Sequence, residues 1–158
     1  MTGSAASCPW LAHYPPGVPA EIDLSATPTL VHLVDEAAAR YGALDQAVFL
    51  GRRYSYARVD AAGRQFAAWL AAQGIGPGAR VAVMMPNVPQ YAAAVFGILR
   101  SGATLVNVNP LFTAPELASQ LYDAKVSAIV VLENFAATLA KSMASLPPMR
   151  VLVAAVGD

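Results

Sequence analysis

The chain has 158 residues, of which 56% are hydrophobic and 13% are charged, and its ten Lys and Arg balance its ten Asp and Glu. A chain of this length buries roughly 70% of its unfolded surface, so wholesale disorder is excluded. The zero formal charge and the lack of a basic run argue against nucleic acid as a partner, because that binding requires Lys and Arg to neutralise phosphates. Charged residues are about half as frequent as the usual ~25%, so we expect other structure to cover part of the apolar surface.

Neither a secretory signal nor a membrane span is expected from the sequence. Residues 1–7 contain no Lys or Arg and lead into no apolar run. The 19 uncharged residues between Arg80 and Arg100 are interrupted by two prolines, an Asn and a Gln, which favours a buried strand followed by a buried helix. Cys8 is the single cysteine of the sequence and cannot form an internal disulfide, which is compatible with a reducing compartment. We therefore expect a cytoplasmic protein.

Residues 1–28 are predicted to form an extended arm. They contain five prolines, each of which fixes φ and removes a backbone donor. Trp10, Leu11, Tyr14 and Val18 give the arm apolar side chains to bury, which an unstructured tail does not need. The arm is expected to lie over the domain or over a partner subunit. Residues 29–158 are predicted to form one α/β subdomain.

A helix is predicted to follow the arm. Thr27 and Pro28 are the residue types of a helix start, with a hydroxyl for the cap and a proline in the first turn. Apolar residues then recur on one helical face, and Gly42 is expected to end the helix.

A hairpin and a second helix come next. Two short strands are predicted within residues 46–56, joined by a turn at Gly51 and Arg52. Ser55 is placed to cap a helix that ends before Gly74.

Apolar runs rich in β-branched residues then open near Val81, Thr104, Ser127 and Arg150, each 23 residues after the last, with helix-like segments between them. This alternation predicts an α/β fold, a parallel sheet with helices on both faces. Ligands are expected off the carboxyl ends of its strands. The predicted strands are residues 81–85, 104–108, 128–132 and 151–155, and the predicted helices are residues 90–100, 114–122 and 135–143.

The loop after the second of these strands carries the most informative polar residues. Asn107 and Asn109 bring amides to a strand end, and Thr113 offers a hydroxyl at a helix start, where free N–H groups can receive an anion or a carbonyl. The plainer alternative, which the spacing favours, is that Thr113 only caps the helix and the Asn side chains tie the loop together.

No catalytic or metal-binding motif is found. The glycines of residues 74–78 follow a helix and precede a strand, which is the order of a helix cap and turn and not of a dinucleotide fingerprint. His13 and His32 stand 19 residues apart in unlike contexts, and no carboxylate or Cys completes a plausible ligand set with them. No Ser lies in a nucleophile elbow. Tyr91, Phe96 and Phe112 are expected to be core aromatics.

Four segments resemble the bacterial long-chain fatty-acid–CoA ligases of the AMP-forming acyl-adenylate superfamily: residues 9–22, 80–91, 107–113 and 129–135. The resemblance implies a parent enzyme several times longer, which joins a fatty acid to ATP, releases pyrophosphate and passes the acyl group to CoA. ATP, Mg²⁺ and CoA are therefore expected for the parent, with peripheral association at the inner face of the membrane. The family's phosphate loop, adenine-binding segment, ribose-binding Asp and catalytic Lys all lie beyond the last residue of this chain. No catalytic residue is therefore assigned, and the chain alone is expected to bind no cofactor and to be inactive.

One family site is carried over to this sequence. In related acetyl-CoA ligases the loop that matches Asn109, Pro110 and Leu111 lies along the CoA tunnel, with the positions of Phe112 and Thr113 beside it. Arginines that hold the CoA phosphates in those relatives are absent here, where residues 134–137 read Asn-Phe-Ala-Ala. The alternative hypothesis is a naturally short, non-catalytic module that binds a partner or forms a homo-oligomer through its arm. A stand-alone nucleotide-binding α/β protein is a third.

Overall fold

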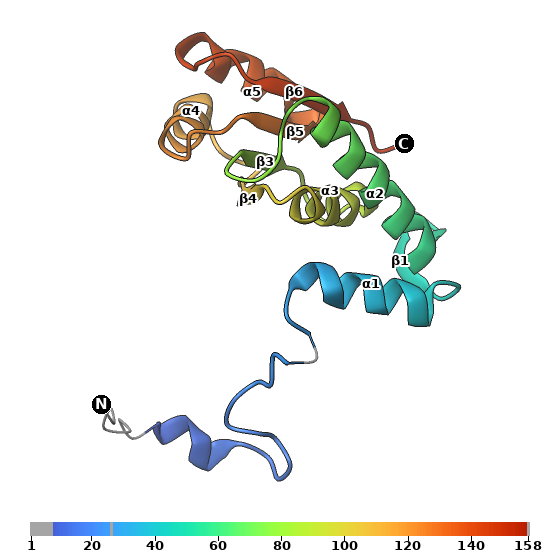
Figure 1. Ribbon diagram of the computed structural model, residues 1–158. Helices are drawn as coiled ribbons and strands as arrows, with labels where there is room; N and C mark the ends of the chain where they lie inside the picture. The colour runs from blue at the N-terminus through green and yellow to red at the C-terminus, as the bar shows by residue number, and fades with distance from the viewer. Residues whose placement is uncertain (1–7, 26, 158) are drawn as a thin grey trace.

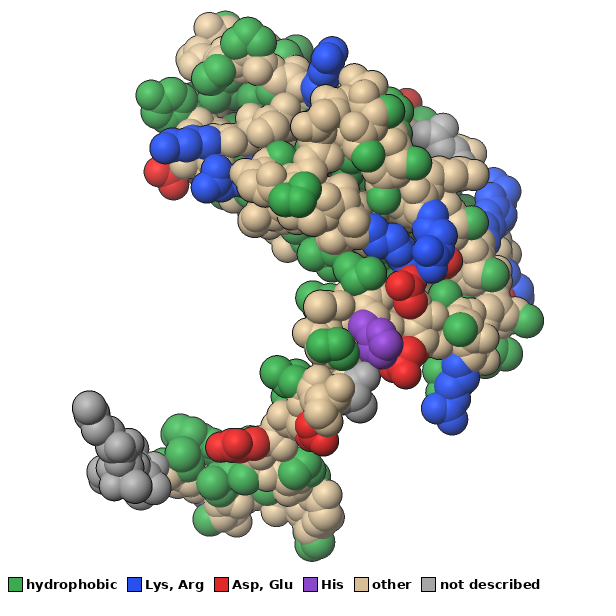
Figure 2. All heavy atoms as spheres, in the orientation of Figure 1, with side chains coloured by type: hydrophobic (Ala, Val, Ile, Leu, Met, Phe, Trp, Pro, Cys, Tyr) green, Lys and Arg blue, Asp and Glu red, His purple; other side chains and the backbone are tan. Residues whose placement is uncertain are grey.

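The computed structural model describes residues 8–25 and 27–157 (Figure 1). The predictions for residues 1–7, 26 and 158 lie outside these ranges. In Figure 1 the segment before the first long helix extends away from the α/β part of the chain. It holds a short 3₁₀ helix, η1 (Pro9–His13), and every described residue from 8 to 25 is exposed. Packing of the arm over its own domain is thus not observed. Apolar side chains cover much of this segment in Figure 2.

Helix α1 (Leu30–Tyr41) begins two residues later than the sequence predicted. Thr29, not Thr27, is its N-cap, and the Thr29 hydroxyl accepts a hydrogen bond from the backbone N–H of His32 at 3.1 Å. Both threonines have the right chemistry, and in the structure it is Thr29 that has the extended backbone of a cap directly before the first helical residue. Gly42 ends the helix as predicted.

The hairpin pairs β1 (Asp45–Phe49) with β2 (Arg52–Ser55) in antiparallel register. Its turn lies at Leu50 and Gly51, whose φ values are 48° and 78°, and not at Gly51 and Arg52. A two-residue turn that matches strand twist requires positive φ at both positions, which Gly51 adopts freely and Leu50 only under strain. Ser55 then caps α2 (Tyr56–Ala72) as predicted, since its Oγ accepts from the N–H of Arg58.

Four parallel strands form the main sheet, in the order β4-β3-β5-β6. The chain steps from β3 to β4, crosses back over β3 to β5, and continues to β6. Right-handed crossovers in these opposite directions place helices on both faces, which confirms the predicted fold class. The elements are β3 (Arg80–Met84), α3 (Pro89–Arg100), β4 (Thr104–Asn107), α4 (Ala114–Asp123), β5 (Ala128–Leu132), η2 (Glu133–Phe135), α5 (Ala136–Ser142), η3 (Met143–Ser145) and β6 (Arg150–Ala154).

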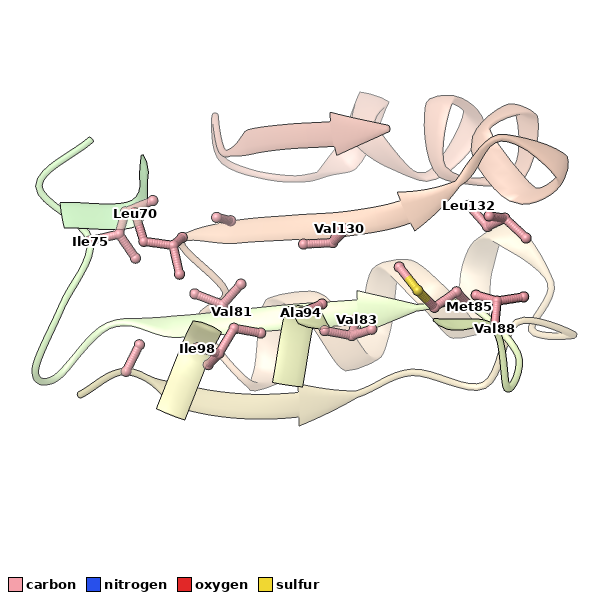
Figure 3. Close-up of a cluster of buried hydrophobic side chains, with 12 residues drawn as sticks. Leu70, Ile75, Val81, Val83, Met85, Val88, Ala94, Ile98, Val130 and Leu132 are labelled. Carbon is pink, nitrogen blue, oxygen red and sulfur yellow. The ribbon is translucent and has the colours of Figure 1, made fainter. Parts of the chain in front are cut away.

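Alternate residues of the central strands enter two separate cores. Val81 and Val83 of β3 and Val130 of β5 face α2 and α3, where they pack against Leu70 and Ile98 (Figure 3). The neighbouring strand residues Ala82, Met84, Ile129 and Val131 face the other way, toward Leu117 and Leu121 of α4 and Leu139 of α5. Among the described residues no helix combines the length and the apolar character needed to cross a membrane.

Helices α2 and α3 approach each other closely at two glycines. A Cβ placed on Gly97 of α3 would lie 2.8 Å from the carbonyl oxygen of Gly63 in α2 and 2.7 Å from Cδ1 of Phe66. Helix α3 can therefore carry no larger residue at Gly97 unless the two helices move apart.

An ion-pair cluster joins α1, α2 and α3. Asp35 of α1 accepts from Nη2 of both Arg64 and Arg100, at 2.6 Å each. Asp60 of α2 also pairs with both arginines. The hydrogen bond from Arg100 holds the pKa of Asp35 below its usual value. The side chain of Arg100 is only 8% exposed, whereas that of Arg64 is 56% exposed.

Candidate functional site

A cavity of about 470 Å³ lies at the carboxyl ends of β3, β4 and β5. This is the edge at which parallel α/β sheets bind ligands, next to the strand where the direction of the connections reverses. We call it the strand-end cavity. Its lining residues are Val83, Met85, Pro86, Asn87, Tyr91, Asn107, Val108, Asn109, Pro110, Leu111 and Phe135.

Asn107, at the end of β4, is held at two of its atoms. Its side-chain Oδ1 accepts a hydrogen bond from the Tyr91 hydroxyl at 3.0 Å. Its backbone carbonyl accepts from Nε2 of Gln120 on α4, also at 3.0 Å. Contacts from α3 and α4 therefore fix both the strand end and the orientation of its carboxamide.

The loop after β4 begins with a turn closed by Asn109. Its Oδ1 accepts from the backbone N–H of Leu111 at 3.0 Å, an interaction of the kind by which Asn stabilises turns. Pro110 and Leu111 follow along the cavity wall, and Leu111 is well exposed. The structure thus places three of the five loop residues singled out in the sequence at one cavity.

The other two residues of the loop point elsewhere. Phe112 packs against the core between the sheet and α4. Thr113 caps α4, and both its N–H and its hydroxyl donate to Oε2 of Glu116, at 2.8 and 2.7 Å. The Thr113 backbone N–H is the main reason that the pKa of Glu116 lies below its usual value. The capping role considered for Thr113 is therefore present, and its hydroxyl is already engaged.

Tyr91 is the cavity residue whose role the sequence reasoning missed. Its ring packs against the first core, as expected for a core aromatic, but its hydroxyl reaches the strand-end cavity. A signal was available in the sequence, because this tyrosine lies in the first turn of a helix that follows a strand end. A phenylalanine would be enough there if packing were the only role.

Of the residues that the structure describes, no Asp, Glu, Lys, Arg or His lines the strand-end cavity. Mg²⁺ binds through carboxylates and phosphates, so a donor set of amides and one phenol does not fit this ion. Within residues 8–25 and 27–157, no three His, Cys, Asp or Glu side chains are grouped to hold a metal. The cavity is suited to a neutral ligand with polar groups along an apolar chain.

A second cavity of about 300 Å³ lies between α1, α2 and α3. Phe96, expected in the core, lines this cavity together with Leu33 and Leu99. Its wall is apolar apart from Gln46, Tyr56 and Asp60. Because polar groups from several strand ends converge only on the first cavity, that cavity is the candidate site.

Comparison with known proteins agrees with this architecture. The sequence profile of the AMP-binding enzymes matches residues 34–156. The chain belongs to this family. The AMP-binding family match includes all four parallel strands and every residue of the strand-end cavity.

Similar family members include long-chain-fatty-acid–CoA ligases. The ligase of Salmonella typhimurium is 44% identical over 151 residues, which are 94% of this chain and 27% of that protein. The ligase of Bacillus subtilis is 38% identical over 125 residues, which are 79% of this chain and 22% of that protein. The chain thus spans about a quarter of the length of these relatives.

Solved structures of family members share the fold. The N-terminal domain of FACL13 from Mycobacterium tuberculosis is 25% identical with a TM-score of 0.72, over 78% of this chain and 33% of that one. A benzoate CoA ligase from Burkholderia xenovorans LB400 gives a TM-score of 0.74 at 17% identity, over 78% of this chain and 25% of that one. The predicted membership in the acyl-adenylate ligases is confirmed.

Proposed function

We propose that the chain is the N-terminal portion of a long-chain fatty-acid–CoA ligase, which activates a fatty acid with ATP and transfers the acyl group to CoA. The observation that carries this proposal is the 44% identity to such a ligase over 94% of the chain. The match covers only 27% of that ligase, which fits one part of a larger enzyme.

The sequence predicts that the chain alone binds no cofactor; we propose instead that its strand-end cavity binds part of CoA. The loop of Asn109, Pro110 and Leu111 contributes one wall, and apolar side chains such as Met85 and Phe135 contribute others. The pantetheine arm of CoA is a neutral chain with amide groups, so it matches a cavity that combines amides with apolar surface. The phosphates of CoA, by contrast, would find no cation among the lining residues.

We expect the purified chain to form no acyl-adenylate. Transfer of the adenylyl group requires stabilisation of the charge on the reacting phosphates by cations or a phosphate loop. Pyrophosphate release with ATP, Mg²⁺ and palmitate is the measurement, and the Salmonella typhimurium ligase serves as positive control. Release above the enzyme-free blank that depends on palmitate would refute the expected inactivity of the chain.

The proposal extends to self-association through the arm. Trp10 and Ile22 are 57% and 84% exposed, an unusual state for residues of their size. We expect light scattering at micromolar concentration to detect dimers, and the double substitution of Trp10 and Ile22 by serine to shift the chain toward monomer. Leu50→Ser, which removes an equally exposed apolar side chain from the hairpin turn, is the control. A wild-type chain that remains monomeric would refute this part of the proposal.

A further inference from the structure

The orientation of Asn107 suggests a specific task for it within the strand-end cavity. We propose that Asn107, oriented by Tyr91, is the hydrogen-bond donor that selects an uncharged, elongated ligand with carbonyl groups at this site. The inference rests on the proposed function for the identity of the ligand, pantetheine. The donor role itself follows from the hydrogen bonds of the structure.

The first step concerns which atom of Asn107 is left for a ligand. A carboxamide has one acceptor oxygen and one NH₂ group on opposite branches of a planar unit. The Tyr91 hydroxyl donates to the oxygen, Oδ1. The Nδ2 group has no hydrogen-bond partner among the described residues, and the Asn107 side chain is exposed at the cavity. The half of the carboxamide that still lacks a partner is therefore its donor.

The second step concerns why this orientation persists. The ring of Tyr91 packs into the core beneath α3, so the hydroxyl is held in place by buried surface. The backbone of Asn107 is fixed by Gln120 on one side, and the next residue, Val108, donates its N–H to the Val83 carbonyl at 3.0 Å. A donor held in this way loses little conformational entropy when a ligand binds.

The third step concerns what such a site accepts. Asn109 shows the same pattern as Asn107, because its Oδ1 accepts from the Leu111 N–H and its NH₂ group has no hydrogen-bond partner within the described part of the chain. Two oriented amides at the cavity thus offer donors, and no charged side chain lines it. Carbonyl oxygens of a neutral ligand are complementary to this arrangement, and pantetheine carries two amide carbonyls. An ammonium group has only donors, so it can form no hydrogen bond with these NH₂ groups.

The test exchanges the donor for an acceptor at the same place. Asn107→Asp can still accept from the Tyr91 hydroxyl, but it presents oxygen and negative charge where the NH₂ group was. We expect pantetheine, titrated into the full 158-residue chain and followed by NMR, to bind at least about tenfold more weakly to this variant. Cysteamine, which has an ammonium group and no carbonyl, is expected to bind to Asn107→Asp more tightly than it binds to the wild type. Loss of packing alone would not produce this reversal of preference.

Two further variants complete the design. Asn134→Asp places the same charge at the same edge of the sheet, on an exposed residue that does not line the cavity, and is expected to change pantetheine binding less than about twofold. Tyr91→Phe keeps the ring and removes the hydroxyl, so the amide is free to rotate. An intermediate loss of about threefold to tenfold is expected for this variant.

The outcomes separate the two proposals. If the wild type binds pantetheine and Asn107→Asp behaves like Asn134→Asp, the donor role of Asn107 is wrong while the assignment of the cavity to CoA stands. If the wild type shows no saturable binding of pantetheine, that assignment fails together with the inference. The reversal between pantetheine and cysteamine, confined to Asn107→Asp, supports both.

Discussion

Replacement of Arg100 by methionine is expected to lower the free energy of unfolding by about 3 kcal/mol. Arg100 is almost fully buried, and its Nη2 alone serves both Asp35 and Asp60. Without it, Asp60, which is only 15% exposed, keeps its charge in a poorly solvated position with Arg64 as its remaining partner. Urea denaturation of both proteins at neutral pH measures the difference.

Arg64→Met is the matched control for Arg100→Met. It removes a guanidinium that pairs with the same two carboxylates, Asp35 and Asp60, but Arg64 lies largely in solvent. Ion pairs of exposed residues contribute less than about 1 kcal/mol, so a small loss is expected. Equal destabilisation by the two substitutions would show that burial of Arg100 is not what makes it important.

Gly97→Ala is expected to destabilise the protein by about 1–3 kcal/mol. In an ordinary exposed helix the same change would stabilise by about 1 kcal/mol, because glycine is a poor helix former. At this position the new Cβ meets the Gly63 carbonyl at 2.8 Å, and a backbone atom cannot move aside as a side chain can. Thermal and urea unfolding of the variant are therefore expected to show a loss of stability, whereas helix propensity alone predicts a gain.

Gly63→Ala, on the facing helix, is the control for the crossing of α2 and α3. A Cβ there would lie 3.2 Å from Nη1 of Arg100 and from Cβ of Phe96, and 3.4 Å from the Ala93 carbonyl. These contacts are milder than those at Gly97, and the Arg100 side chain can adjust. We expect a smaller loss for Gly63→Ala. A loss larger than that of Gly97→Ala would contradict this account of the helix contact.

The parallel sheet was predictable because its signal repeats along the chain. The apolar runs that open near Val81, Thr104, Ser127 and Arg150 all became strands that begin within one residue of those positions. The covering helices were located for the same reason, since each segment between two strands has the length of one crossover. Local chemistry placed the Ser55 cap equally well.

Features that depend on a choice between similar neighbours were not predictable in the same way. Thr27 and Thr29 have the same hydroxyl, and the residue types alone do not decide which of them caps α1. The hairpin turn shifted by one residue because Leu50 tolerates a positive φ that its type does not favour. The ion-pair cluster joins residues that are as many as 65 positions apart, and it depends on how three helices pack.

The candidate site was only partly visible in the sequence. Asn107 and Asn109 were singled out because amides at a strand end are unusual, and both lie at the cavity. The orientation of each amide could not be inferred, because it depends on hydrogen bonds from Tyr91 and from the Leu111 N–H. Phe112 was grouped with the loop by adjacency, but its side chain turns inward to the core.

The order of the strands also bears on how such a protein is made. Every residue that lines the strand-end cavity lies from Val83 to Phe135, on or just after three strands that follow one another in the chain and form one continuous part of the sheet. Short loops cost little entropy to close, and synthesis proceeds at roughly 5–20 residues per second. All walls of the cavity therefore leave the ribosome within seconds of one another. In a relative of full length, this surface can be complete on the nascent chain while most of the polypeptide is still to be synthesised, and later segments then assemble on it.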